Sequence, residues 1–229
     1  MQKTKMDINY SIKYSSRKTI SIIVERDRSV VVRAPFNTSE ELIARELNKR
    51  KRLLLKKIEH NYKYPFPKPA KEFVSGEALL YLGKNYKLYV TEDLNETIVF
   101  DNKFFIAKSS QIKANKLFRE WYIKSATKIL VPKAKAIAKQ LGVTYQNINI
   151  LDLKYRWGSC TPKNNIHFNW RIIKAPMSVI EYIIVHELTH LLEPNHTPEF
   201  WNRVAVMQPN FEKAKAWLKE YGGELEVDF

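Results

Sequence analysis

The sequence contains a single cysteine, Cys160, among 229 residues. An intrachain disulfide is therefore excluded, and so is a metal site built from several thiolates, which leaves His, Asp and Glu as ligands for any metal. Long apolar runs are also missing, because charged residues interrupt every stretch well before the roughly 18 residues that a membrane-spanning helix needs. Residues 1–7 show no apolar segment typical of a secretory signal, so we expect a cytoplasmic protein with no membrane partner.

Acidic residues are scarce except near the C-terminus. The formal net charge is +15, from 39 Lys and Arg against 24 Asp and Glu. Residues 178–229 hold 4 basic and 9 acidic residues, so residues 1–177 hold the other 35 basic and 15 acidic residues, a balance of +20. A basic N-terminal half of this kind suits nucleic acid or an acidic partner. A lysine-rich, solvated surface explains the same charge without a partner, and the lack of a recognisable nucleic-acid-binding motif favours that interpretation.

The first half of the chain predicts a small basic β/α unit, which we place at residues 1–108. Hydrophobic residues make up 45% of the sequence, enough to bury a core. Alternating apolar residues predict strands at 7–14, 20–24 and 30–33, and a helix follows at about 40–61. Pro65, Pro67 and Pro69 indicate a stiff linker at 65–69. Further short strands are expected at 78–82, 86–91, 97–101 and 103–107.

The second half, residues 109–229, predicts a separate domain and gives an α+β fold overall. A helical pattern runs from about 110 to 141, with Gly142 as its stop and Pro132 as a kink or break. The expected apolar stripe of this helix consists of Leu117, Trp121, Ile129, Ile137 and Leu141. A short sheet is expected from segments 148–153, 155–159 and 166–172. Helices at about 178–192, 198–207 and 209–221 then complete the chain.

The segment His186-Glu187-Leu188-Thr189-His190 is an H-E-x-x-H motif. Residues four apart lie on one face of a helix about one turn apart, so both imidazoles can reach a single metal ion. Glu187 lies beside the position where zinc would activate a water molecule, so a general-base role is expected. Ser178 and Glu181 read as a capping box at the start of this helix.

His196 is the best candidate for a third ligand. The helix should end near Glu193, because the residue before Pro194 is disfavoured in the helical region. The chain can then reverse and bring His196 back to the metal, while Thr197 caps the next helix. Glu193 is the alternative third ligand, because it lies three residues after His190. Three of the five histidines fall within eleven residues, which favours a metal site over isolated core histidines.

At these residues the sequence resembles the YgjP-like family of metal-dependent hydrolases, which is related to the Wss1-like and SprT-like zincin proteases. The resemblance covers nearly the whole chain, and its C-terminal block is the most specific part. The segments that carry it are Val32-Arg33-Ala34-Pro35, Ser75-Gly76-Glu77, Tyr81-Leu82-Gly83, Arg156-Trp157-Gly158-Ser159-Cys160, Ile166-His167-Phe168-Asn169-Trp170-Arg171, Ala175-Pro176, the H-E-x-x-H motif and Asn195-His196-Thr197-Pro198-Glu199-Phe200-Trp201.

This resemblance implies a zincin-like metallopeptidase domain with three histidine ligands and a catalytic glutamate, at His186, His190, His196 and Glu187. Zincins pair an extended substrate with a strand at the edge of the cleft, and the expected edge is the segment from Ile166 through His167 and Phe168 to Trp170. Candidate donors to the oxyanion of the reaction are Tyr182, Arg156, Arg171 and His167, and Asn169 is expected to support the motif helix or a ligand.

The resulting hypothesis is a peptidase that holds one zinc ion per chain and acts on a peptide or protein substrate. Zinc would polarise the scissile carbonyl, and Glu187 would move a proton from water to the leaving amine. Two alternatives remain open. One is a protein associated with DNA or RNA through its basic half, and the other is a zinc module without catalysis, for which a glutamate in the motif would have no use.

Overall fold

The computed structural model describes residues 8–25, 28–61, 71–92, 94, 96–153 and 156–226. The chain divides into two compact units, residues 1–68 and 69–229. The division lies at residue 68 and not at residue 108, because the strands between residues 78 and 107 share one hydrophobic core with the long helix that follows them. The expected proline linker at 65–69 lies outside the described residues.

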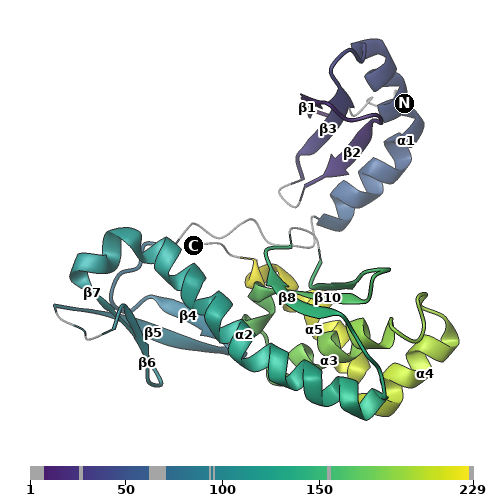
Figure 1. The fold of residues 1–229 in the computed structure, drawn as a ribbon. Coiled ribbons are helices and arrows are strands. Elements are labelled where there is room, and N and C mark those ends of the chain that lie inside the picture. The colour runs from purple at the N-terminus through teal and green to yellow at the C-terminus, as the bar shows by residue number, and fades with distance from the viewer. Residues whose placement is uncertain are drawn as a thin grey trace, which may run out of the picture. The chain divides into compact units, whose positions relative to one another are not determined.

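The N-terminal unit is a three-stranded sheet with one helix (Figure 1). Strands β1 (Tyr10–Ser15), β2 (Ser21–Val24) and β3 (Val30–Pro35) take the order β1-β3-β2, with β3 parallel to β1 and antiparallel to β2. Helix α1 (Glu40–Asn61) begins where the Ser39 hydroxyl accepts a hydrogen bond from the amide of Leu42 at 3.3 Å. The core of this unit joins β3 to α1 through Val30, Val32, Ala34, Ile43, Leu47 and Leu54.

The second unit begins with a four-stranded sheet that packs on a long helix. Strands β4 (Ala78–Tyr81), β5 (Lys84–Thr91), β6 (Ile98–Phe100) and β7 (Phe104–Ala107) take the order β4-β5-β7-β6. A short 3₁₀ segment, Lys108–Lys113, leads into helix α2 (Ala114–Leu141). Aromatic rings join the sheet to the helix, and Tyr122 donates from its hydroxyl to the carbonyl of Leu80 at 2.8 Å.

Helix α2 passes through Pro132 as one helix, so the expected break is absent there. It ends as predicted at Gly142, whose left-handed φ of 67° lets its amide reach carbonyls of the last turn. The predicted apolar stripe is not the centre of the buried face of this helix, because all its members are only half-buried. The fully buried face repeats every fourth residue and contains several alanines, which give little hydrophobic signal in a sequence: Ala114, Phe118, Tyr122, Ala126, Leu130, Ala134 and Ala138.

A second sheet of this unit contacts α2 through its first strand and α3 through the other two. Its strands β8 (Asn147–Leu151), β9 (Gly158–Cys160) and β10 (Asn165–Asn169) take the order β8-β10-β9, with β10 parallel to β8 and antiparallel to β9. The prediction that Ile166, His167 and Phe168 form the substrate edge is therefore wrong: β10 is the central strand and is paired on both sides. Among the described residues β9 is an edge strand of this sheet, and it contacts the motif helix.

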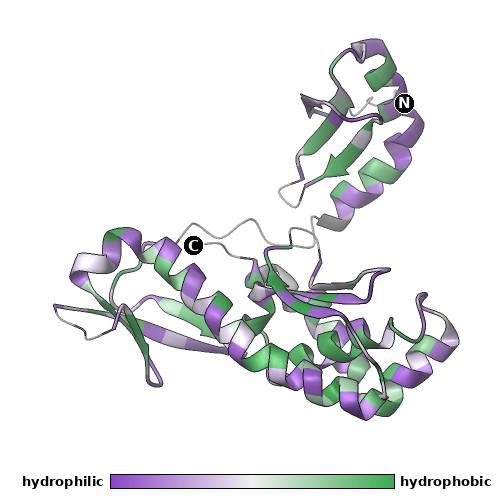
Figure 2. Cartoon of the chain, viewed as in Figure 1, coloured by the Kyte–Doolittle hydropathy of each residue, from purple (hydrophilic) through white to green (hydrophobic). Residues whose placement is uncertain are grey.

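Three helices complete the chain: α3 (Met177–Thr189), α4 (Pro198–Met207) and α5 (Phe211–Leu225). A 3₁₀ segment, Trp170–Lys174, connects β10 to α3. The capping box at Ser178 is wrong, because Pro176 is the N-cap and its carbonyl accepts from the amides of Val179 and Ile180. Hydrophobic colour covers much of α3 in Figure 2, in agreement with its burial on most sides.

Sheets and helices that are segregated along each unit confirm the α+β class. Within the described part of the chain, no helix combines the length and the apolar character needed to cross a membrane.

Candidate metal centre

Helix α3 and the turn after it bring three imidazoles together. His186 lies in the last turn of α3, and His190 is the C-cap residue directly after it. The turn reverses the chain, and Thr197 caps α4 by accepting from the amide of Phe200 at 3.3 Å, with Pro198 as the first helical residue. The cap at Thr197 was predicted, and together with Pro198 it fixes the corner at which His196 lies.

The three histidines form a group that can hold one metal ion. Their ligand atoms all lie within 4.8 Å of one another, and the two Nε2 atoms of His186 and His196 are 3.0 Å apart. Two nitrogens bound to one tetrahedral zinc at about 2.0–2.1 Å are separated by roughly 3.3 Å, so small side-chain adjustments bring these donors to zinc geometry. Among the described residues no other His, Cys, Asp or Glu joins this group, and three nitrogens match the donor set of catalytic zinc sites.

Hydrogen bonding orients the second ligand. Nδ1 of His190 lies 3.1 Å from the backbone carbonyl of Glu193, so the ring donates there and leaves Nε2 for a metal. The Glu193 carboxylate does not join the histidines, and its Oε1 atom lies 3.9 Å from Nε of Arg203 instead. Glu193 thus contributes its main chain to the site, while His196 occupies the position of the third donor.

The aromatic rings of Phe200 and Trp201 pack against the three histidines. Phe200 is fully buried, and its ring centroid lies 5.0, 4.7 and 4.8 Å from those of His186, His190 and His196. The exposed His196 ring also stacks on Trp201, at 5.6 Å and an interplanar angle of 21°. Trp201 stacks in turn on Phe211 at 5.5 Å. These contacts restrict an otherwise exposed ring to one orientation.

Burial keeps the imidazoles in the form that binds metals. Burial, together with the smaller effects of the neighbouring His190, His196 and Lys215, lowers the pKa of His186 to about 3. Burial also lowers the pKa of His190, against the opposing effect of its hydrogen bond to Glu193. Both rings are therefore neutral near pH 7, as metal ligation requires.

Glu187 belongs to α3, and its side chain lies against β9. The residue is 7% exposed. Burial raises the pKa of this carboxyl to about 8, against the charge of Arg156 and a hydrogen bond from the backbone amide of Cys160. A divalent cation on the three imidazoles would favour the ionised form and lower that pKa. The carboxyl also fills the space beside Gly158, where a side chain would otherwise lie.

A cleft of about 790 Å³ opens over the triad. Of the residues expected beside the metal, Tyr182 and Arg156 line this cleft, whereas Asn169, Arg171 and His167 do not. Tyr182 is 6% exposed and packs edge-on against His186 at 5.8 Å. The other lining residues are mainly apolar or small: Trp157, Gly158, Ser159, Cys160, Thr161, Pro162, Asn164, Ile183, Leu191, Pro194 and Leu218.

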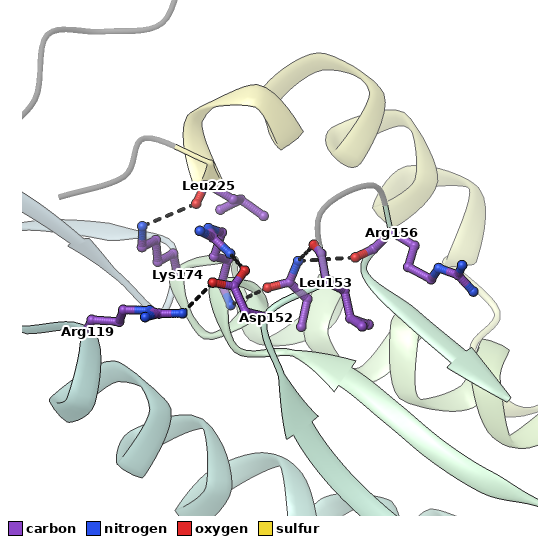
Figure 3. A network of polar contacts seen from close by, with 8 residues as sticks. Arg119, Asp152, Leu153, Arg156, Lys174 and Leu225 are labelled. Atoms are coloured by element: carbon purple, nitrogen blue, oxygen red, sulfur yellow. Dashed lines mark hydrogen bonds and ion pairs between the residues drawn. The ribbon is translucent and has the colours of Figure 1, made fainter. Parts of the chain in front are cut away.

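Asn169 holds the backbone at Leu153 and Arg156, two residues that are labelled in Figure 3. Its Nδ2 donates to the carbonyls of Leu153 and Arg156 at 2.7 and 3.1 Å, and its Oδ1 accepts from the amide of Arg171 at 3.1 Å. Asp152 joins the same network by pairing with Arg119 and Arg171. The expectation that Asn169 supports α3 or a ligand is wrong, because its partners are the backbone before β9 and the turn after β10.

Sequence reasoning missed three supports of this site: Gly158, Asp152 and the ring of Phe200. The motif after Arg156 already contained Gly158, and the residues after His196 contained Phe200. Their roles depend on contacts between segments far apart in the sequence. The pairing of Asp152 with Arg171 had no signal in either segment.

Three convergent imidazoles, with a buried carboxyl in the same cleft, define the site of a metal-dependent hydrolase. The family model of the YgjP-like metallopeptidase domain matches residues 18–221. The chain therefore belongs to the YgjP-like family, and the resemblance seen in its motifs is confirmed. No curated protein matched the chain.

Proposed function

We propose that this protein is a zinc-dependent peptidase with His186, His190 and His196 as ligands and Glu187 as the general base. The observation that carries the proposal is the placement of a buried carboxyl beside three imidazoles whose donor atoms lie within 4.8 Å of one another. A structural zinc site has no need of such a carboxyl, and its fourth position is filled by protein. The peptidase proposal therefore explains more of the cleft than a non-catalytic zinc module does.

A bound zinc ion supplies Lewis acidity, which polarises a carbonyl and makes water easier to deprotonate. Glu187 accepts the proton of the attacking water and delivers it to the leaving amine. The amide of Cys160 holds the carboxyl in place. Tyr182 and Arg156 both line the cleft, and either can donate to the oxygen on which negative charge develops.

Substrate binding is assigned to β9. In the described part of the chain this short strand pairs with β10 alone, and all three of its residues line the cleft. An extended peptide can add to its open side through main-chain hydrogen bonds. The mainly apolar walls then favour peptides with hydrophobic side chains next to the scissile bond.

The test compares zinc-loaded wild type with Glu187→Gln and with Glu199→Gln, an exposed glutamate of α4 as the matched control. The substrate is fluorescein-labelled casein, an unfolded protein with many apolar segments. Wild type and the control should release labelled peptides, whereas Glu187→Gln should keep its zinc and lose activity by a factor of at least about 100. Full turnover by Glu187→Gln would remove Glu187 as the base.

A second candidate function rests on the charge of the N-terminal unit. Residues 1–68 hold 17 basic and 7 acidic residues. Four exposed cations, Arg45, Lys49, Arg52 and Lys56, recur at helical spacing on α1, on the face opposite the buried Ile43, Leu47 and Leu54. Within the described part of the chain, none of the four forms an ion pair. Such a stripe suits the phosphates of a nucleic acid, which would bring the peptidase to proteins bound there.

Binding to a fluorescent 20-base-pair duplex, and to its single strand, should be measured across a salt series. The variant replaces Arg45, Lys49, Arg52 and Lys56 by Gln, and the control replaces four exposed lysines of α2, Lys124, Lys128, Lys135 and Lys139. Salt-steep binding that only the α1 variant loses would support this function. Equal loss in both variants would mean that net charge alone causes the binding. No binding near physiological salt would reject a nucleic-acid function.

A further inference from the structure

The backbone conformation of residue 158 does not require a glycine. Gly158 lies in β9 opposite Phe168 and does not belong to the glycines with positive φ, which are Gly76, Gly83 and Gly142. A Cβ atom on Gly158 would lie 2.6 Å from Cγ, 2.7 Å from Oε1 and 2.8 Å from Cδ of Glu187. These separations are shorter than any non-bonded contact between such atoms, so the side chain of Glu187 and a Cβ cannot share this space.

Gly83 shows what a structural glycine looks like in the same unit. It has a φ of +78°, and a Cβ there would lie 2.9 Å from Cα of Pro176, which is backbone. At Gly158 the three nearest atoms all belong to the end of one side chain. An alanine at residue 158 therefore leaves the sheet room to form, provided that the carboxyl of Glu187 moves.

We propose that Gly158 is a positioning residue for the general base. Its missing side chain opens the space in which the carboxyl of Glu187 lies against β9 and accepts from the amide of Cys160. This inference deepens the proposed peptidase function and rests on it. The same strand thus presents its open side to the substrate and its glycine to the base, which fixes the base relative to the bound peptide.

An alanine at residue 158 should displace the carboxyl by about 1 Å and weaken its hydrogen bond to Cys160. A displacement of that size costs about 100-fold in rate when the group moves a proton in the transition state. Substrate affinity should change little, because main-chain pairing along β9 does not need the carboxyl. The expected signature is a fall in kcat of about 10- to 100-fold with KM within about twofold of wild type.

The experiment compares Gly158→Ala with Gly222→Ala, a control in which the new Cβ meets only Trp157 at an ordinary 3.4 Å. Zinc content, casein kinetics and the binding of benzohydroxamate, a zinc chelator that also hydrogen-bonds to a neighbouring carboxylate, should be measured for both. Gly158→Ala should keep one zinc per chain, lose kcat and bind benzohydroxamate at least about tenfold more weakly, whereas Gly222→Ala should match wild type.

A double mutant separates positioning from damage to the fold. In a Glu187→Gln background, Gly158→Ala should cause no further loss of benzohydroxamate binding, because both changes remove the same interaction. Equal binding and kcat in Gly158→Ala and wild type would overturn the inference, as would an undiminished loss in the Glu187→Gln background. Wild type that binds zinc but neither benzohydroxamate nor casein would overturn the proposed function and this inference together.

Thermal unfolding of the metal-free proteins keeps the inference testable if Gly158→Ala folds poorly. The three atoms nearest the new Cβ all belong to Glu187, so a Gly158→Ala, Glu187→Ala protein should recover the Tm that Gly158→Ala loses. No recovery would mean that the new Cβ disrupts the sheet itself, and the positioning role would then be rejected.

Discussion

Replacing Glu187 by Gln should stabilise the metal-free protein, and the gain should grow with pH. Burial raises the pKa of Glu187 to about 8 from its ordinary value of 4.5, against Arg156 and the Cys160 amide. Between these two pH values the folded state holds a proton that the unfolded chain has lost. The stability due to this group is complete below pH 4.5 and is lost as the pH rises through 8. A glutamine does not titrate, so it escapes this loss.

The size of the effect follows from the two pKa values. Each pH unit of separation corresponds to about 1.4 kcal/mol, which sets an upper limit of about 5 kcal/mol at pH 8 and above. Relaxation and water entry around a buried carboxylate reduce such limits, so we expect a gain of about 2–3 kcal/mol at pH 8. The gain should fall close to zero at pH 4.5. His186 also titrates, but it is present in both proteins and cancels in the difference.

Urea unfolding of chelator-treated proteins at several pH values between 4.5 and 8.5 measures this difference. Glu199→Gln is the control, because the same chemical change at an exposed residue should give no pH-dependent gain. Added zinc should remove most of the gain, since a cation beside Glu187 favours the ionised carboxyl. If the difference in unfolding free energy between Glu187→Gln and wild type stays constant across this pH range, the titration of buried Glu187 does not cause it.

Three further results are expected. Trp201→Ala removes the ring that stacks on His196 and should weaken zinc affinity about 10- to 100-fold by chelator competition. Trp217→Ala, in α5, removes a ring that packs on Tyr221 and should leave zinc affinity unchanged. Burial raises the pKa of Asp152, but hydrogen bonds and charges from Arg171 and Arg119 outweigh it and hold that pKa below its ordinary value. Asp152→Asn should therefore cost about 1 kcal/mol at pH 7, and the cost should disappear as the pH falls below 3.8, as followed by urea unfolding. A cost that does not depend on pH would exclude the ion pairs as its source. Gly83→Ala combines a left-handed φ with a backbone clash and should lower stability by about 1–3 kcal/mol without changing the zinc stoichiometry.

Local signals predicted the helices and the corner of the site well. The H-E-x-x-H spacing, the proline after Glu193 and the cap at Thr197 act within a few residues, so the sequence alone indicated where His196 returns toward α3. The strands of the N-terminal unit also matched their alternating patterns.

Features that depend on distant segments were not predictable in this way. Whether β10 is an edge or a central strand is decided by its parallel pairing with β8, which no local pattern reports. The unit boundary lies at residue 68 because Leu79 and Phe104 pack on α2. The prolines had indicated a linker in that region, but the strands after it were expected to belong to the N-terminal unit. Gly158 carried no turn signal, since its reason is the volume of a side chain 29 residues later.

Metal content most directly tests whether His186, His190 and His196 hold one zinc ion. Untagged wild type should be compared with His196→Ala and Glu193→Ala by elemental analysis, after zinc has been added and the excess removed. We expect about one zinc per chain in wild type and Glu193→Ala, and a large loss in His196→Ala. Wild type without metal, or a site that survives His196→Ala and fails in Glu193→Ala, would contradict this expectation.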